Sequence, residues 1–444
     1  MASAAEQLAA SINFSAIAKA DELKKRIWFT LGALVIYRLG TYIPLPGIDP
    51  VAFEQSFTSS QQGVLELFNM FAGGAVQRMA IFALNIMPYI SASIIIQLMT
   101  SVVPTLEALK KEGESGRKVI NQYTRYLTVV LAIFQAWGIA IGLQGQGNVV
   151  ANPGPFFVIS TILSLTGGTI FLMWLGEQIT ARGIGNGASL IIFAGIVAAF
   201  PSAIVSTLEL GRQGALSTAL ILIVLALSVV VVAFIVFVER AQRRLLITYP
   251  KRQVGQNQMV GGQTSFLPLK INTAGVIPPI FASSLLLLPT TIANFSQSGA
   301  TGWLATFNTY FAHGRPAYML FYVALIVFFA FFYTAIVFNP TETADNLKKH
   351  GGFIPGIRPG ERTAEYIDHV LTRVTVIGAI YLSAICLLPE MLISYAALPF
   401  YFGGTSLLIV VSVTMDTVAQ VHGHLQAQQY EGLVRKAKLR GRRR

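Results

Sequence analysis

Long apolar runs separated by shorter polar segments dominate this chain of 444 residues. Each run is about 18–25 residues long, which is enough for an α-helix to cross about 30 Å of hydrocarbon. The pattern therefore predicts an all-α, polytopic membrane protein with ten transmembrane helices. The expected spans are 27–44, 79–103, 122–143, 155–176, 188–208, 216–238, 273–293, 317–338, 371–389 and 399–418.

Two of these runs are interrupted by proline at corresponding places in the chain. The second run is broken at Pro88 and the seventh at Pro278 and Pro279. A proline kinks a helix and removes one hydrogen bond, which lipid tolerates only where neighbouring protein satisfies the freed groups. Five spans precede Gly211 and five follow it, so the two halves would have opposite orientations in the membrane. Paired interruptions of this kind indicate an inverted repeat with its functional site near the midplane.

The stretch around the first interruption has an unusual pattern. It contains the apolar piece Val64–Phe71, which is too short to cross a bilayer, and then two adjacent glycines. Further along, Ile86, Ile90 and Ile94 recur every four residues and share one helical face, with Gln97 near the same stripe. We expect a proline-kinked helix packed in a bundle.

Composition agrees with a membrane protein, because 54% of the residues are hydrophobic and 12% are charged, against about 25% charged in soluble domains. Lysine and arginine predict the orientation, since cytoplasmic loops are enriched in them. If the N-terminus is cytoplasmic, 28 of the 32 basic residues fall on the cytoplasmic side. The exceptions are Arg38, Arg78, Arg212 and Arg315. We therefore expect both termini in the cytoplasm, and the charged residues before the first span argue against a cleavable signal.

Two of the predicted cytoplasmic connections, 239–272 and 339–370, are longer than topology requires. They are basic and rich in polar residues, glycine and proline, as in Pro355–Glu361. Topology and attraction to anionic lipid account for part of the net charge of +12. Long structured loops usually carry a function, however, so their length favours docking of a large, acidic cytoplasmic partner.

Groups that carry chemistry are scarce. The five histidines lie in loops or near the tail, Cys386 is alone in an apolar run, and no catalytic set falls within a span. The glycines of Ala181–Ser189 resemble part of a nucleotide loop, but they follow a span and lack the GK[ST] sequence, which indicates a tight turn. No cofactor or metal is expected.

The span centres also lack charge, whereas ion-coupled transporters usually place charged side chains there. An aliphatic constriction that blocks ions by dewetting suits a passive, gated pore for a large substrate. A secondary transporter for small solutes is the alternative that inverted repeats and broken helices support. An intramembrane enzyme is a third class, for which the sequence offers no catalytic set.

Long motifs connect the chain to a known family. The resemblance runs from about residue 22 to the end of the chain. The matching segments are Tyr42–Gly47, Ile81–Leu98, Lys110–Lys118, Phe171–Gly187, Val238–Arg244, Leu267–Ser284, Phe338–Lys349, Pro355–Glu361 and Pro399–Val411. The chain thereby resembles the SecY family, the central subunits of the bacterial protein-translocation channel.

The resemblance implies an hourglass-shaped pore between two inverted five-helix halves, closed at its waist by a ring of aliphatic side chains. The ring positions are Ile86, Ile90, Ile192, Ile280 and Ile409. A further ring position, often isoleucine in relatives, is Ala188 here. The family's plug, which closes the ring from outside, falls at about 64–74. Its apolar side chains are Val64, Leu65, Leu67, Phe68, Met70 and Phe71.

The resemblance also implies a lateral gate formed by the second, third, seventh and eighth spans. Its polar residues near the cytoplasmic end are Gln97 and Asn272, whose structural alternative is a weak interhelical hydrogen bond. The two long basic loops correspond to the docking surface for the SecA motor and the ribosome. The docking residues carried over are Arg243, Arg244, Lys251, Arg252 and Arg358.

The function implied is a protein-conducting channel in the bacterial inner membrane. It would pass unfolded secretory chains and release membrane segments sideways into lipid, driven by the SecA ATPase or the ribosome. Its expected partners are SecE, SecG, SecA, the ribosome, signal peptides, nascent chains and lipids. The expected organisation is a cytoplasmic segment 1–26, a first half 27–210, a second half 211–420 and a basic tail 421–444.

Overall fold

The computed structural model describes residues 20–59, 69–144, 149–213, 218–249, 251–253, 259–261, 264–295, 315–396 and 404–441. Val64, Leu65, Leu67 and Phe68 of the predicted plug therefore lie outside the described residues. The chain forms two compact units. The first comprises residues 1–205, 292–299 and 409–444, and the second comprises residues 206–291 and 300–408.

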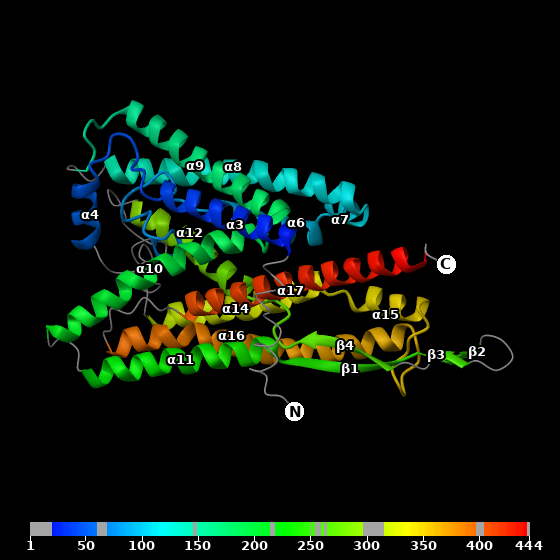
Figure 1. The fold of residues 1–444 in the computed structure, drawn as a ribbon. Helices are drawn as coiled ribbons and strands as arrows, with labels where there is room; N and C mark the ends of the chain where they lie inside the picture. Colours follow the sequence, from blue (N-terminus) through cyan, green and yellow to red (C-terminus); the bar gives the residue numbers. More distant parts are fainter. Residues whose placement is uncertain are drawn as a thin grey trace. The chain divides into compact units, whose positions relative to one another are not determined.

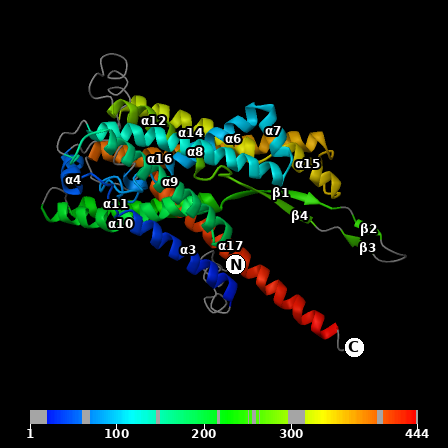
Figure 2. The same cartoon turned by 90° about the horizontal axis from the view of Figure 1, so that it is seen from above.

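The first unit is a helical bundle in which α8 packs along both α6 and α9 (Figure 1). Its last helix, α17, continues as one long helix towards the C-terminus (Figure 2). The helices are α3 (Asp21–Gly40), α4 (Pro50–Ser59), α6 (Met87–Val102), α7 (Pro104–Lys111), α8 (Glu114–Gln144), α9 (Pro155–Arg182), α10 (Gly187–Arg212) and α17 (Gly404–Gly441). The last few residues of α10 and the first few of α17 belong to the second unit.

The second unit combines apolar helices with a β-hairpin. An aromatic pair joins two of its helices: Phe281 of α12 packs against Phe329 of α14 edge to face, with ring centroids 5.6 Å apart. The helices are α11 (Thr218–Arg240), α12 (Ile277–Phe295), α14 (Pro316–Val337), α15 (Pro340–Lys349) and α16 (Glu361–Ala396). The strands are β1 (Gln242–Thr248), β2 (Lys251–Gln253), β3 (Met259–Gly261) and β4 (Thr264–Lys270).

The predicted helical membrane fold is confirmed. Among the described residues, seven helices are long and apolar enough to cross a membrane, and α6 with α7 makes an eighth if that bent pair is one span. Helices α3 and α12 occupy the first and seventh predicted spans, so the described helices are consistent with ten. Large apolar side chains such as Leu222 and Phe237 of α11 are exposed, as expected for a helix that faces lipid.

The two proline-broken spans differ from the prediction. Residues 72–86 form turns, and α6 begins at Met87 instead of at about 79. Pro88 stands in the first turn of α6, where an N–H has no helical partner, so this proline starts a helix and does not kink one. Helix α12 likewise begins at Ile277, directly before its two prolines. Both proline sites, Pro88 and the pair Pro278 and Pro279, therefore mark the start of a helix behind non-helical chain.

The irregular stretch 72–86 lies directly against helix backbones. A β-carbon at Gly168 of α9 would overlap the carbonyl oxygen of Ile81, and one at Gly195 of α10 would overlap that of Phe71. Small buried residues fill the same region, among them Ala72 and Ala80. The close approach is possible only because these helix positions lack a side chain.

We expect Gly168→Ala to destabilise the protein by roughly 1–3 kcal/mol, since the added methyl group forces the packed backbone apart. Gly167→Ala is the matched control, because nothing lies within 4 Å of a β-carbon at that position. Thermal unfolding in detergent measures the difference. Equal unfolding temperatures for the two variants would contradict the packing described above.

Candidate functional site

The chain before α6 is held by side chains that donate to three successive carbonyl oxygens. The Asn85 amide donates to the oxygen of Phe71 over 2.6 Å. The Tyr37 hydroxyl donates to that of Ala72 over 3.4 Å, and the Arg38 guanidinium donates to that of Gly73 over 2.5 Å. Residues 69–74 are the described part of the predicted plug, and these bonds attach it to α3 and to the turn before α6.

Four of the five predicted ring residues belong to the first unit, and all four are buried. Ile86, Ile90, Ile192 and Ile409 are between 1% and 9% exposed. The δ-methyl group of Ile86 lies 3.4 Å from a β-carbon built on Gly176, and the backbone nitrogen of Ala188 lies 3.5 Å from it. Ile86 and Ala188 are therefore neighbours around Gly176. Ile280, which is partly buried, belongs to the second unit.

Arg38 and Arg78, two of the four basic residues predicted to lie away from the cytoplasm, both contact the aromatic ring of Tyr42. The Arg78 guanidinium lies 4.2 Å from the centroid of the Tyr42 ring, and the Arg38 guanidinium lies 5.1 Å from it. Arg38 also donates to the Tyr42 hydroxyl over 3.1 Å. These cation–π contacts fix the C-terminal end of α3 to the chain that follows the glycine pair.

The glycine-rich segment after α9 is the tight turn that the sequence predicts. Three of its backbone N–H groups are bonded to side chains, and that of Gly183 donates to the Ile179 carbonyl over 2.7 Å. Ile184 donates to the Thr30 hydroxyl over 3.1 Å, Gly185 to the Gln420 side chain over 2.8 Å, and Gly187 to the Thr180 hydroxyl over 2.9 Å. These groups are therefore unable to cradle a phosphate, and they join α3, α9 and α17 at one point.

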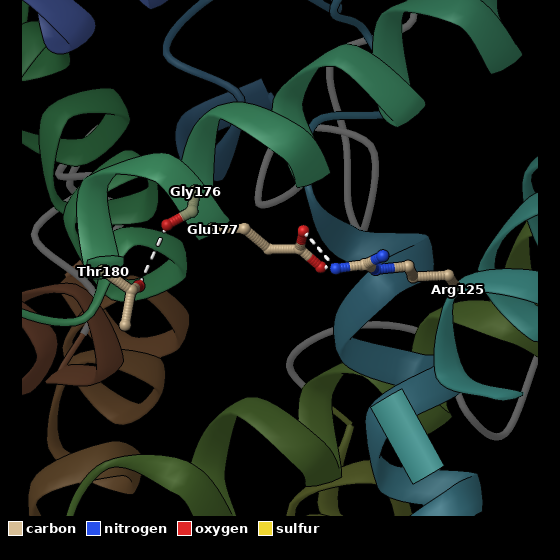
Figure 3. Close-up of polar contacts among 4 residues, drawn as sticks. All are labelled: Arg125, Gly176, Glu177 and Thr180. Atoms are coloured by element: carbon tan, nitrogen blue, oxygen red, sulfur yellow. Dashed lines mark hydrogen bonds and ion pairs between the residues drawn. The ribbon is translucent and has the colours of Figure 1, made fainter. Parts of the chain in front are cut away.

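A bidentate ion pair lies close to this turn. Figure 3 shows the side chains of Arg125 from α8 and Glu177 from α9 pointing toward each other, with the Thr180 hydroxyl donating to the Gly176 carbonyl. The two nitrogen–oxygen distances of the ion pair are 2.8 and 2.7 Å. Both side chains are partly exposed, so we expect the pair to orient the two helices more than to stabilise them.

The two long basic loops form one folded module. Strand β1 pairs with β4, and Thr248 at the end of β1 exchanges two backbone hydrogen bonds with Phe353 of the second loop. Beneath the hairpin, Leu245, Leu269, Ile354 and Ile367 form a buried core. We call the hairpin, α15, the 350–360 turn and the start of α16 the loop module. Sequence reasoning treated the two loops separately and predicted no strand.

The loop module presents three of the five predicted docking residues. Arg243 and Arg244 are exposed on β1, and Arg358 is exposed on the turn before α16. The turn is fixed, because the Thr363 hydroxyl donates to the Arg358 carbonyl over 3.0 Å. Lys251 and Arg252 lie on β2, paired with β3, and their side chains are outside the described part.

The two predicted gate residues lie in different units. Asn272 is buried, and its amide donates to a carboxylate oxygen of Glu239 over 2.7 Å and to the Gly275 carbonyl over 3.1 Å. This bond joins the end of α11 to the segment before α12, at the base of the hairpin. On α6, the side-chain oxygen of Gln97 is buried without a hydrogen-bond partner. Their joint role at a gate stays a prediction.

Sequence reasoning missed three contacts that organise these regions. The Asn85 amide, the Gln420 side chain and the Glu239 carboxylate each bond a distant segment. The signal in the sequence was the polar residue itself, since an asparagine or glutamine in an apolar run needs a partner. Nothing local in the sequence identifies that partner.

The model of the SecY family matches residues 80–418. The protein translocase subunit SecY of Escherichia coli (strain K12) is 56% identical over 425 residues, which cover 95% of this chain and 96% of that protein. The subunit of Rickettsia conorii is 55% identical over 427 residues, with 95% and 98% covered. The chain belongs to the SecY family.

Solved structures of lower sequence identity share the fold. One described as the structure of a protein-conducting channel has a TM-score of 0.68 at 17% identity, covering 90% of this chain and 92% of that one. Sec61 in a canine ribosome–channel complex has a TM-score of 0.62 at 17% identity, with the same coverage. The likeness spans both units of the chain. It supports the SecY-family fold for the described helices.

Proposed function

We propose that this chain forms a protein-conducting channel that passes unfolded secretory polypeptides across the bacterial cytoplasmic membrane. Membrane segments of its substrates leave sideways into lipid. SecY-family membership over 95% of the chain is the observation that carries the proposal. The chain acts as a passive pore, and the work is done by the SecA ATPase or by the ribosome. Both termini lie in the cytoplasm, and SecE and SecG are the accompanying membrane subunits.

The proposed constriction consists of Ile86, Ile90, Ile192, Ile280 and Ile409, with Ala188 at a sixth position. Branched aliphatic side chains exclude water from a narrow pore and block ions, yet they offer no fixed hydrogen bonds to an extended chain. The burial of the four ring residues of the first unit supports this arrangement. The approach of both Ile86 and the backbone of Ala188 to Gly176 supports placing these two positions close together in the ring.

Replacing Ile90 or Ile280 with asparagine should wet the constriction and raise the resting ion leak at least severalfold. Ile90→Val, which keeps the site apolar, should stay as tight as the parent. Conductance of the purified channel in planar bilayers measures this. The dewetting seal is wrong if the asparagine variants stay as ion-tight as Ile90→Val.

We propose that the loop module docks SecA and the ribosome through its basic face. The hairpin segment 242–271 contains five basic residues and no acidic one. Its buried core and its pairing with Phe353 support a rigid surface, so the backbone that carries Arg243, Arg244 and Arg358 is ordered before a partner arrives. An ordered backbone loses little conformational freedom on binding, which favours affinity.

Arg358→Glu should reduce SecA-driven export at least tenfold without changing the folding of the loop module. Reversing a charge at a docking surface adds repulsion to the loss of attraction. Arg362→Glu is the matched control, since this exposed arginine of the same module pairs with Glu365 at 3.8 Å. Export of a secretory protein into membrane vesicles is the measurement. Equal export by the two variants would exclude the docking role of Arg358.

A further inference from the structure

Three side chains bind one short piece of backbone at the described end of the predicted plug. The carbonyl oxygens of residues 71, 72 and 73 accept from Asn85, Tyr37 and Arg38 respectively. The donors come from two separate places in the sequence, the end of α3 and the turn before α6. A helix leaves its last carbonyl groups without partners, and residues 69–71 are the last helical residues before the turns. Asn85 and Arg38 bond the carbonyls of residues 71 and 73, and Tyr37 adds a second donor at residue 72, whose carbonyl also accepts from the Ala75 N–H over 3.3 Å.

The backbone at and after the bonded carbonyls has left-handed conformations. Gly73 and Gly74 have φ angles of 64° and 83°, and Asn85 has a φ angle of 50°. Only glycine and, less readily, asparagine adopt this conformation at low cost, so these positions suit a pivot. The segment between Gly74 and Asn85 is held in place, because Ile81 donates to the Ile43 carbonyl and Leu45 donates to that of Met79. Movement about the glycine pair therefore concerns the chain before Gly73.

We propose that Asn85, Tyr37 and Arg38 form a latch that holds residues 71–73 in the closed position of the plug. The inference rests on the proposed channel function and identifies the residues that set its resting state. The three are positioning residues, because each bonds the plug's attachment and not the translocated chain. Release of the latch frees the chain before Gly73 to move about the glycine pair.

The bonds of the latch are strong enough to order the segment and weak enough to be broken. The Tyr37 bond is long, at 3.4 Å. The side-chain oxygen of Asn85 is buried without a partner, so this residue satisfies only part of its hydrogen-bonding capacity in the closed position. Side-chain hydrogen bonds inside membrane proteins average about 0.6 kcal/mol, which corresponds to about threefold in an equilibrium constant.

The test follows the exposure of Met70, which is 5% exposed in the structure. The single cysteine is first removed by Cys386→Ser, and Met70→Cys is then labelled from outside with a membrane-impermeant thiol reagent. Tyr37→Phe removes only the hydroxyl and keeps the ring that stacks on Phe82. Asn85→Gly removes only the side chain and tolerates the left-handed backbone. Ser91→Ala, a buried change on α6, is the matched control.

Each latch variant is expected to label about three times faster than the control, and the double variant about eight times faster if the bonds act independently. The unfolding temperatures should match that of Ser91→Ala. Labelling rates equal to the control in both Tyr37→Phe and Asn85→Gly would overturn the latch.

Ion leak in the same variants separates the latch from the proposed channel function. Faster labelling with increased leak supports both the latch and a sealing plug. Faster labelling without increased leak supports the latch and contradicts a sealing role for the plug. If the latch variants label no faster than the control while Ile90→Asn raises the ion leak, the latch is overturned and the aliphatic seal is supported.

Discussion

Every backbone N–H and C=O group away from water needs a hydrogen-bond partner, and the stretch 72–86 contains no helix or strand that would supply one regularly. The chain meets this requirement in three ways. Turns bond the stretch to itself, as from Ala80 to the Ala75 carbonyl. Ile81 donates to the Ile43 carbonyl, and Leu45 donates to that of Met79. Side chains then bond the carbonyls of residues 71–73.

These bonds determine where the isoleucine face of α6 begins. Pro88 stands in the first turn of α6, with Ile86 at the N-cap position. The position of this first turn is therefore set by the irregular chain that precedes it. Ile86 and Ile90 are then one turn apart, and both are buried. The aliphatic waist that we propose thus depends on a stretch of chain that is not itself helical. The loop module has a different basis, since its strands bond each other and its own apolar core.

The sequence predicted much of this and failed in identifiable places. Apolar length predicted the long helices, because that signal is the sum of many residues. It failed at residues 79–86, where an apolar composition suits a helix but Asn85 adopts a left-handed conformation. The prolines were correctly recognised as interruptions, but a proline in the first helical turn and one in the middle look alike without tertiary context.

The candidate sites show the same division. The tight turn at 183–187 was predicted from its glycines, whereas its partners Thr30 and Gln420 are distant in sequence and were not. In the basic loops, Leu245 with Ile247 and Leu267 with Leu269 are alternating apolar positions, a strand signal that charge and glycine content obscured. The pairing of Thr248 with Phe353 depends on packing between two loops, which local pattern does not encode.

We propose that the two proline-started helices, α6 and α12, jointly line a path for a polypeptide. Single cysteines at Ile86 and Ile280, introduced after Cys386→Ser, test it by crosslinking to a secretory chain stalled during export. We expect crosslinks from both positions. Crosslinks from neither position, together with saturable uptake of a small solute, would contradict it and favour a transporter.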